Sequence, residues 1–162
     1  INAFYRDSAI YVTHHQDNFE DLLDDIIHEL AHSLEEVYTS EIYEDLKLEN
    51  EFLQKRHRLY SNLKYDEENV TLEDFINPEY SWEFDKFLMD EIGYDKLEIN
   101  CQNLFLSPYS VTSLREYYAT GFEEFFIGDR EQLLDLCPVL FSKIKMLGDL
   151  ENGIHLYNSR RR

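Results

Sequence analysis

The sequence has few of the residues that mark disulfide-rich, loop-rich or membrane-spanning proteins. Its 162 residues include 2 cysteines, 3 prolines and 5 glycines. Cys101 and Cys137 are isolated, which excludes a disulfide framework and predicts buried thiols, although a single bridge between them stays open. No stretch reaches the roughly 20 apolar residues of a membrane span, and no signal-peptide pattern is present, so we expect no membrane association. The composition is typical of a compact, mostly helical fold.

Basic residues are also scarce, because 15 Lys and Arg stand against 34 Asp and Glu, and the net charge is −19. A protein that binds nucleic acid needs a basic face for the phosphates, so we expect no nucleic-acid partner. The acidic surface could favour basic peptides, but keeping the protein solvated is its more general role. One basic cluster interrupts the acidic interior of the chain, from Lys55 to Arg58. We predict that it pairs with neighbouring acids at the surface.

The spacing of apolar residues predicts a single α+β domain that is mostly helical, with a small N-terminal sheet or hairpin. Strands are expected at 3–5 and 9–13. Helices are expected at 19–38, at 40–64 (one helix or a pair), at 71–75, at 81–92 and from 113 onwards. The stretch 97–105 could be a strand or a loop. The chain begins at Ile1 and not at Met, so we expect a piece of a longer protein. Neither its cellular location nor its oligomeric state follows from the sequence.

The most informative stretch is the H-E-x-x-H motif within the helix expected at 19–38. Residues four apart share a helix face, so His28 and His32 can both place an imidazole nitrogen on one zinc ion. Glu29 can then reach a water molecule at that metal. Both histidines project opposite the centre of the helix's apolar stripe, which predicts that they point away from the core. The alternative is a solvated polar face, because this motif also arises by accident in a chain rich in Glu and His.

A catalytic zinc ion usually has three protein ligands and one open position, so a third ligand must come from elsewhere. Ser113 and Glu116 have the spacing of a capping box and predict the start of a later helix. On this helix Glu123 projects towards solvent, whereas Glu124 lies at the border of the buried side, in line with Tyr117 two turns earlier. We therefore predict Glu124 as the third ligand and Tyr117 as a hydrogen-bond donor to the oxyanion. A surface acid and a packing tyrosine are the alternatives.

Other acids of the first helix are weaker candidates. Glu36 as the third ligand is disfavoured, because three ligands spaced by four on one straight helix diverge too far for one tetrahedral ion. Asp25 or Glu36 could instead accept a hydrogen bond from an imidazole N–H, with a solvated acid as the alternative for each.

Taken together, these motifs resemble the lethal-factor-like zinc metallopeptidases, namely the catalytic domain of anthrax lethal factor and the Pro-Pro endopeptidases. The first shared feature is H-E-x-x-H, at 28–32. The second is a Tyr seven residues before a Glu that two Phe directly follow, here Tyr117, Glu124 and residues 125–126. The third is a closing helical region, at 129–144. The resemblance implies a zincin-like fold in residues 1–150, with a C-terminal tail at 151–162. It also implies that His28, His32 and Glu124 hold Zn2+, that Glu29 is the general base, and that Tyr117 stabilises the transition state.

The long charged insert between His32 and Tyr117 departs from this family, so substrate preference is not carried over. The adjacent Tyr118 leaves open which hydroxyl faces the metal. The leading hypothesis is a zinc-dependent endopeptidase that acts on a protein or peptide substrate. The alternative is a non-catalytic zincin-like domain that binds a protein partner, or an acidic helical domain with an accidental motif. Measuring the zinc content of the purified protein distinguishes these two hypotheses.

Overall fold

The computed structural model describes residues 3–15, 18–66 and 70–159, with side chains described as far as residue 150 except at position 66. Within this part of the chain the fold is α+β and mostly helical, as predicted, with a two-stranded antiparallel sheet. The elements in order are β1 Ala3–Arg6, β2 Ala9–Val12, α1 Phe19–Val37, α2 Thr39–Tyr43, α3 Lys47–Asp66, α4 Leu72–Phe75, α5 Trp82–Lys86, the π-helix η1 Phe87–Ile92, α6 Tyr94–Cys101, the 3-10 helix η2 Tyr109–Val111, α7 Leu114–Ile127, α8 Arg130–Leu136 and α9 Pro138–Ser159.

The predicted hairpin and the start of the motif helix are confirmed. Strand β1 pairs with β2 so that Ala3 faces Val12. The side chain of Asn18 caps α1 by accepting a hydrogen bond of 2.9 Å from the backbone N–H of Asp21. Strand β1 lies against α1, where the backbone N–H of Tyr5 donates to a carboxylate on the helix. The hairpin therefore covers part of the helix that carries the H-E-x-x-H motif.

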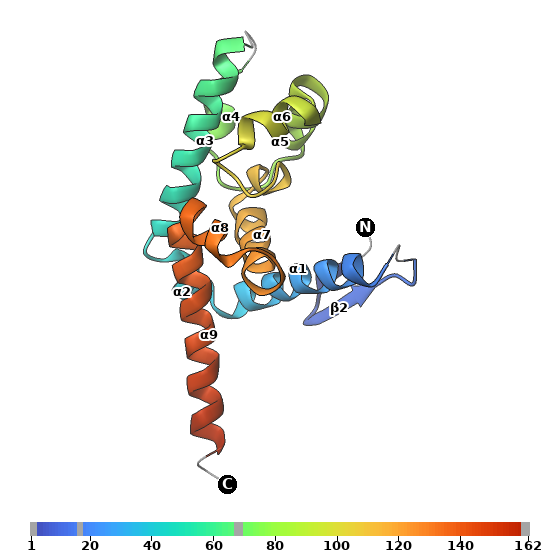
Figure 1. The fold of residues 1–162 in the computed structure, drawn as a ribbon, viewed down its shortest axis with the longest axis vertical. Helices are drawn as coiled ribbons and strands as arrows, with labels where there is room; N and C mark the ends of the chain where they lie inside the picture. Colours follow the sequence, from blue (N-terminus) through green and yellow to red (C-terminus); the bar gives the residue numbers. More distant parts are fainter. Residues whose placement is uncertain (1–2, 16–17, 67–69, 160–162) are drawn as a thin grey trace.

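Helix α7 is the centre of the fold. In Figure 1 the long helices α3 and α9 run along one side of the molecule, α1 and the hairpin extend to the other side, and α7 lies between them. The first half of α7 is buried on nearly every side, at Leu114 and at every position from 117 to 122. Gly121 permits close packing, because a Cβ at this position would collide with the side chain of Leu140 on α9. Residues on α7 are thus held in fixed positions relative to α9.

Several expectations from the sequence are refined. The stretch expected to be a strand or loop at 97–105 begins as helix, because α6 runs to Cys101. Helix α9 continues to Ser159, so it crosses the boundary expected at residue 150. Both cysteines are free and buried, as predicted for isolated thiols. Among the residues described, no helix is long and apolar enough to cross a membrane.

The basic cluster on α3 does not behave as predicted. Lys55 and Arg56 are buried and donate to backbone carbonyl oxygens, and not to surface acids. The guanidinium of Arg56 lies between the rings of Phe52 and Phe84, with its Cζ 4.6 and 4.5 Å from their centroids. It donates to the carbonyls of residues 77, 111 and 112. Burial lowers the pKa of Arg56 to about 9, so the side chain is still charged at neutral pH.

Replacing Arg56 with methionine is expected to lower the free energy of unfolding by about 2–4 kcal/mol, because buried carbonyls at 111 and 112 lose their donor. Those carbonyls belong to Val111, the last residue of η2, and to Thr112, which follows it before α7. Urea denaturation followed by circular dichroism measures the change. The matched control is Arg58→Met on the exposed side of α3, with an expected change within about 0.5 kcal/mol. Equal losses in the two variants would contradict the role of Arg56.

Candidate metal centre

The two histidines of the motif lie between α1 and α7, and not on the outer face of α1 as predicted. The buried residues of α1 are Ala31, His32 and Glu35, whereas Phe19 and Val37 of its apolar stripe are 74% and 69% exposed. A polar face can be buried in this way only when its groups find partners. Helix α7 supplies those partners, because it carries acids and an arginine towards α1.

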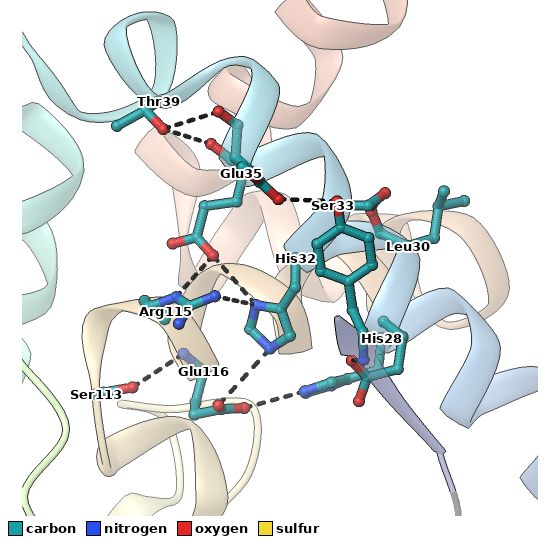
Figure 2. Close-up of polar contacts among 12 residues, drawn as sticks. His28, Leu30, His32, Ser33, Glu35, Thr39, Ser113, Arg115 and Glu116 are labelled. Atoms are coloured by element: carbon teal, nitrogen blue, oxygen red, sulfur yellow. Dashed lines mark hydrogen bonds and ion pairs between the residues drawn. The ribbon is translucent and has the colours of Figure 1, made fainter. Parts of the chain in front are cut away.

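Glu116 of α7 lies between the two imidazole rings (Figure 2). Its Oε2 is 3.0 Å from Nε2 of His28, and its Oε1 is 3.7 Å from Nε2 of His32. One ligand atom from each of the three residues lies within 4.8 Å of the other two. The side chains are 19%, 10% and 16% exposed for His28, His32 and Glu116, so the group is shielded but still reachable from solvent. This arrangement can hold a metal ion.

The second nitrogen of each imidazole ring contacts a different carboxylate. Nδ1 of His32 lies 3.1 Å from Oε2 of Glu35, one turn further along α1. Nδ1 of His28 contacts Oε1 of Glu123, which comes from α7. Both Nε2 atoms therefore face Glu116, while both Nδ1 atoms are engaged elsewhere.

His28 is in contact with two carboxylates, those of Glu116 and Glu123. Burial lowers the pKa of His28, but its contacts with Glu116 and Glu123 outweigh burial and raise that pKa to about 10. In the metal-free protein His28 is therefore a cation at neutral pH, held between two carboxylates. A metal ion that binds here must displace this proton, and it brings the positive charge that the carboxylates already favour.

Glu29 directly follows His28 in α1, and the ring of Tyr109 lies near that of His28. Oε2 of Glu29 accepts a hydrogen bond of 2.6 Å from the backbone N–H of Tyr5 in β1. The ring centroid of Tyr109, in η2, is 6.4 Å from that of His28. Burial raises the pKa of Tyr109 to about 12, and the charges of nearby acids that include Glu116 and Glu29 add to the effect. At neutral pH Tyr109 is thus a phenol that can donate a hydrogen bond.

The structure does not bring Glu124 or Tyr117 to the histidines. Oε1 of Glu124 accepts a hydrogen bond of 2.6 Å from the backbone N–H of Asp129, beyond the end of α7. Glu124 is eight residues after Glu116, which places it about 12 Å further along the helix. Tyr117 is fully buried, and its hydroxyl donates to Oε1 of Glu51 at 2.9 Å. The third position of the group belongs to Glu116 and the nearby tyrosine is Tyr109.

Other sequence-based expectations also change. Glu123 was expected in solvent but contacts His28. The hydroxyl of Tyr118 is buried in the core without a hydrogen-bond partner, so it makes no hydrogen bond to either histidine. Of the two acids considered for holding an imidazole N–H, Glu36 accepts from the hydroxyl of Tyr5 at 2.8 Å, and one oxygen of Asp25 is buried without a partner. Glu35 fills that role for His32.

The capping box explains why the sequence analysis missed Glu116. The capping-box interpretation was half correct: the Ser113 hydroxyl accepts from the backbone N–H of Glu116 at 3.2 Å, while the Glu116 carboxylate turns to the histidines. The sequence did contain a signal for Glu116. Tyr109 also precedes a glutamate by seven residues, and Glu116 is followed directly by two aromatic residues, Tyr117 and Tyr118. The family spacing therefore fits the sequence in two registers eight residues apart.

The chain matches no protein-family model, no curated protein and no solved structure.

Proposed function

We propose that the protein is a zinc-dependent endopeptidase in which His28, His32 and Glu116 hold the metal. The observation that carries the proposal is the orientation of the two rings. Both Nε2 atoms face the carboxylate of Glu116, and both Nδ1 atoms are occupied by other carboxylates. Two histidines and one acid are a donor set of catalytic zinc sites, which leave the fourth position open.

The chemistry of the neighbouring residues favours hydrolysis. The same donor set also holds Fe(II) in oxygenases, but an acid next to the first histidine, as Glu29 is to His28, is a feature of H-E-x-x-H hydrolases. Zinc, when bound, polarises the scissile carbonyl and lowers the pKa of water. Glu29 takes the proton of the attacking water and passes it to the leaving amine. The phenol of Tyr109 donates a hydrogen bond to the oxyanion.

The geometry also supports a place in the lethal-factor-like family with a zincin-like fold. The features that carry this proposal are the H-E-x-x-H helix, the hairpin packed against it, and the register in which Tyr109 precedes Glu116. With this register, the acid and tyrosine expected from the family are the ones that lie beside His28. The insert between His32 and Tyr109 forms α2 to α6, so the peptide sequence preferred by this chain is expected to be its own.

The test combines metal binding with peptide cleavage. Protein stripped with a chelator is titrated with zinc in competition with a chromophoric chelator, and a diverse peptide library is then incubated with both forms. We expect one zinc ion per chain, internal cleavage by the zinc-loaded form, and loss of cleavage on stripping that zinc restores. Zinc binding without cleavage would favour the non-catalytic module. A chain that binds no zinc would refute the metal centre.

A further inference from the structure

Glu35 and Glu123 contact the nitrogens that face away from Glu116, and their placement suggests a shared task. A neutral imidazole has one N–H and one lone pair, and only the nitrogen with the lone pair can bind a metal. An ionised carboxylate accepts hydrogen bonds and cannot donate them, so a carboxylate at Nδ1 favours the form that carries the proton there. At Nδ1 of His32 the Glu35 oxygen, at 3.1 Å, is closer than the Arg115 Nη2 donor at 3.5 Å. Nε2 of both rings faces Glu116, so a metal ion that binds with Glu116 takes Nε2 and leaves the proton on Nδ1, next to Glu35 or Glu123.

Glu35 is held in place by more than His32. Its Oε1 accepts from the Tyr43 hydroxyl at 2.6 Å, and its Oε2 accepts from Nε of Arg115 at 2.9 Å. The side chain is 7% exposed. The contacts with His32, Tyr43 and Arg115 fix the carboxylate in one orientation.

Glu35 also joins the two helices of the centre. Figure 2 shows His32 and Arg115 reaching the Glu35 carboxylate together, with Glu116 on the other side of the His32 ring. Arg115 directly precedes Glu116 in α7. The Glu35–Arg115 ion pair therefore holds α1 and α7 together next to Glu116. Glu123 lies seven residues after Glu116, which returns it to nearly the same side of α7 as Glu116. Its carboxylate, 28% exposed, meets His28 there.

We propose that Glu35 and Glu123 are positioning residues that keep His32 and His28 protonated on Nδ1 and direct Nε2 of each ring towards the metal. This inference rests on the proposed metal centre. Carboxylates in such positions orient the ring and make the imidazole a stronger ligand, and their loss typically costs about 10–100-fold in metal affinity. The chain thus uses five side chains for the centre, of which three bind the metal and two hold the histidines.

The chain offers a matched control for each residue. Glu35→Gln and Glu123→Gln remove a positioning carboxylate, and Glu36→Gln and Glu124→Gln remove one negative charge at the adjacent position. Glu36 binds the Tyr5 hydroxyl and Glu124 binds a backbone N–H, and neither contact involves a histidine. All four variants lose one negative charge. The difference between each variant and its neighbour therefore isolates the contact with the histidine.

Zinc affinity is measured by competition with a chromophoric chelator at neutral pH, and metal-free thermal melts confirm folding. We expect zinc to bind about 10–100-fold more weakly to Glu35→Gln and Glu123→Gln. The controls should stay within about fivefold of the wild type, because an exposed charge contributes little. Equal affinities within each pair would overturn the positioning role. Wild-type protein that binds no zinc would refute the metal centre and this inference together.

A second measurement uses the wild-type protein and does not depend on any variant folding. Nitrogen chemical shifts of the zinc-loaded, 15N-labelled protein report which ring nitrogen of each histidine carries a proton. We expect a protonated Nδ1 and a zinc-bound Nε2 for both His28 and His32. Zinc on Nδ1 of either ring would overturn the proposal for that residue.

Discussion

Replacing Glu29 with glutamine is expected to slow peptide cleavage by about 10²–10⁴-fold while zinc binding stays near the wild-type level. The reason is chemical and not steric. Glutamine has the size of glutamate, and its carbonyl oxygen can still accept the hydrogen bond that the Tyr5 N–H donates to Glu29. An amide cannot take a proton from water at neutral pH, so the general base is lost. Glu29 contributes no ligand atom to the three-residue group, so the metal should remain.

The measurement is kcat/KM on a peptide selected from the library, with zinc stoichiometry determined on the same sample. Glu36→Gln is the control, since Glu36 lies seven residues further on nearly the same side of α1 and also binds Tyr5, through the hydroxyl. We expect this control to cleave within about fivefold of the wild-type rate. A Glu29→Gln protein that holds one zinc ion and cleaves at the original rate would exclude Glu29 as the base.

The motif helix was predictable because its signals are local. The spacing of His28 and His32, the cap at Asn18 and the alternating strands of the hairpin depend on residues close together in the chain. The burial of the histidines was not predictable in the same way. An apolar stripe normally marks the buried face, but α1 buries Ala31 and Glu35 against α7. That outcome depends on acids about ninety residues away, which no periodicity in α1 can reveal.

The structure places Glu116, and not Glu124, beside the histidines for a related reason. The prediction placed Glu124 by assuming that its helix has one buried side and one solvated side. Helix α7 is instead buried at Leu114 and at every position from 117 to 122, and its polar residue Glu116 is largely shielded beside α1. The capping-box spacing of Glu116 concealed this position. The buried Arg56 was missed on similar grounds, because its partners are backbone carbonyls that leave no pattern in the sequence.

Replacing Glu116 with alanine is expected to weaken zinc binding by more than about 100-fold. Loss of a residue that only holds a metal ligand in place typically weakens binding by about 10–100-fold, and loss of a ligand itself should cost more. The Glu116 carboxylate places Oε2 beside Nε2 of His28 and Oε1 beside Nε2 of His32. Without it, two imidazoles remain, and one of them loses a contact that holds its ring in place. Zinc affinity is measured by competition with a chromophoric chelator, and cleavage should fall with zinc occupancy at limiting metal.

Glu124→Ala decides between the two registers in which the family spacing fits the sequence. Its expected cost is about 1 kcal/mol of stability, from the lost hydrogen bond to the Asp129 N–H, with zinc affinity near the wild-type value. The opposite result, a zinc-deficient Glu124→Ala and an unaffected Glu116→Ala, would require α7 to shift by two turns. Such a shift would move Tyr117 out of the core and break its bond to Glu51. The packing of α7 and the identity of the third ligand are therefore tested by the same pair of variants.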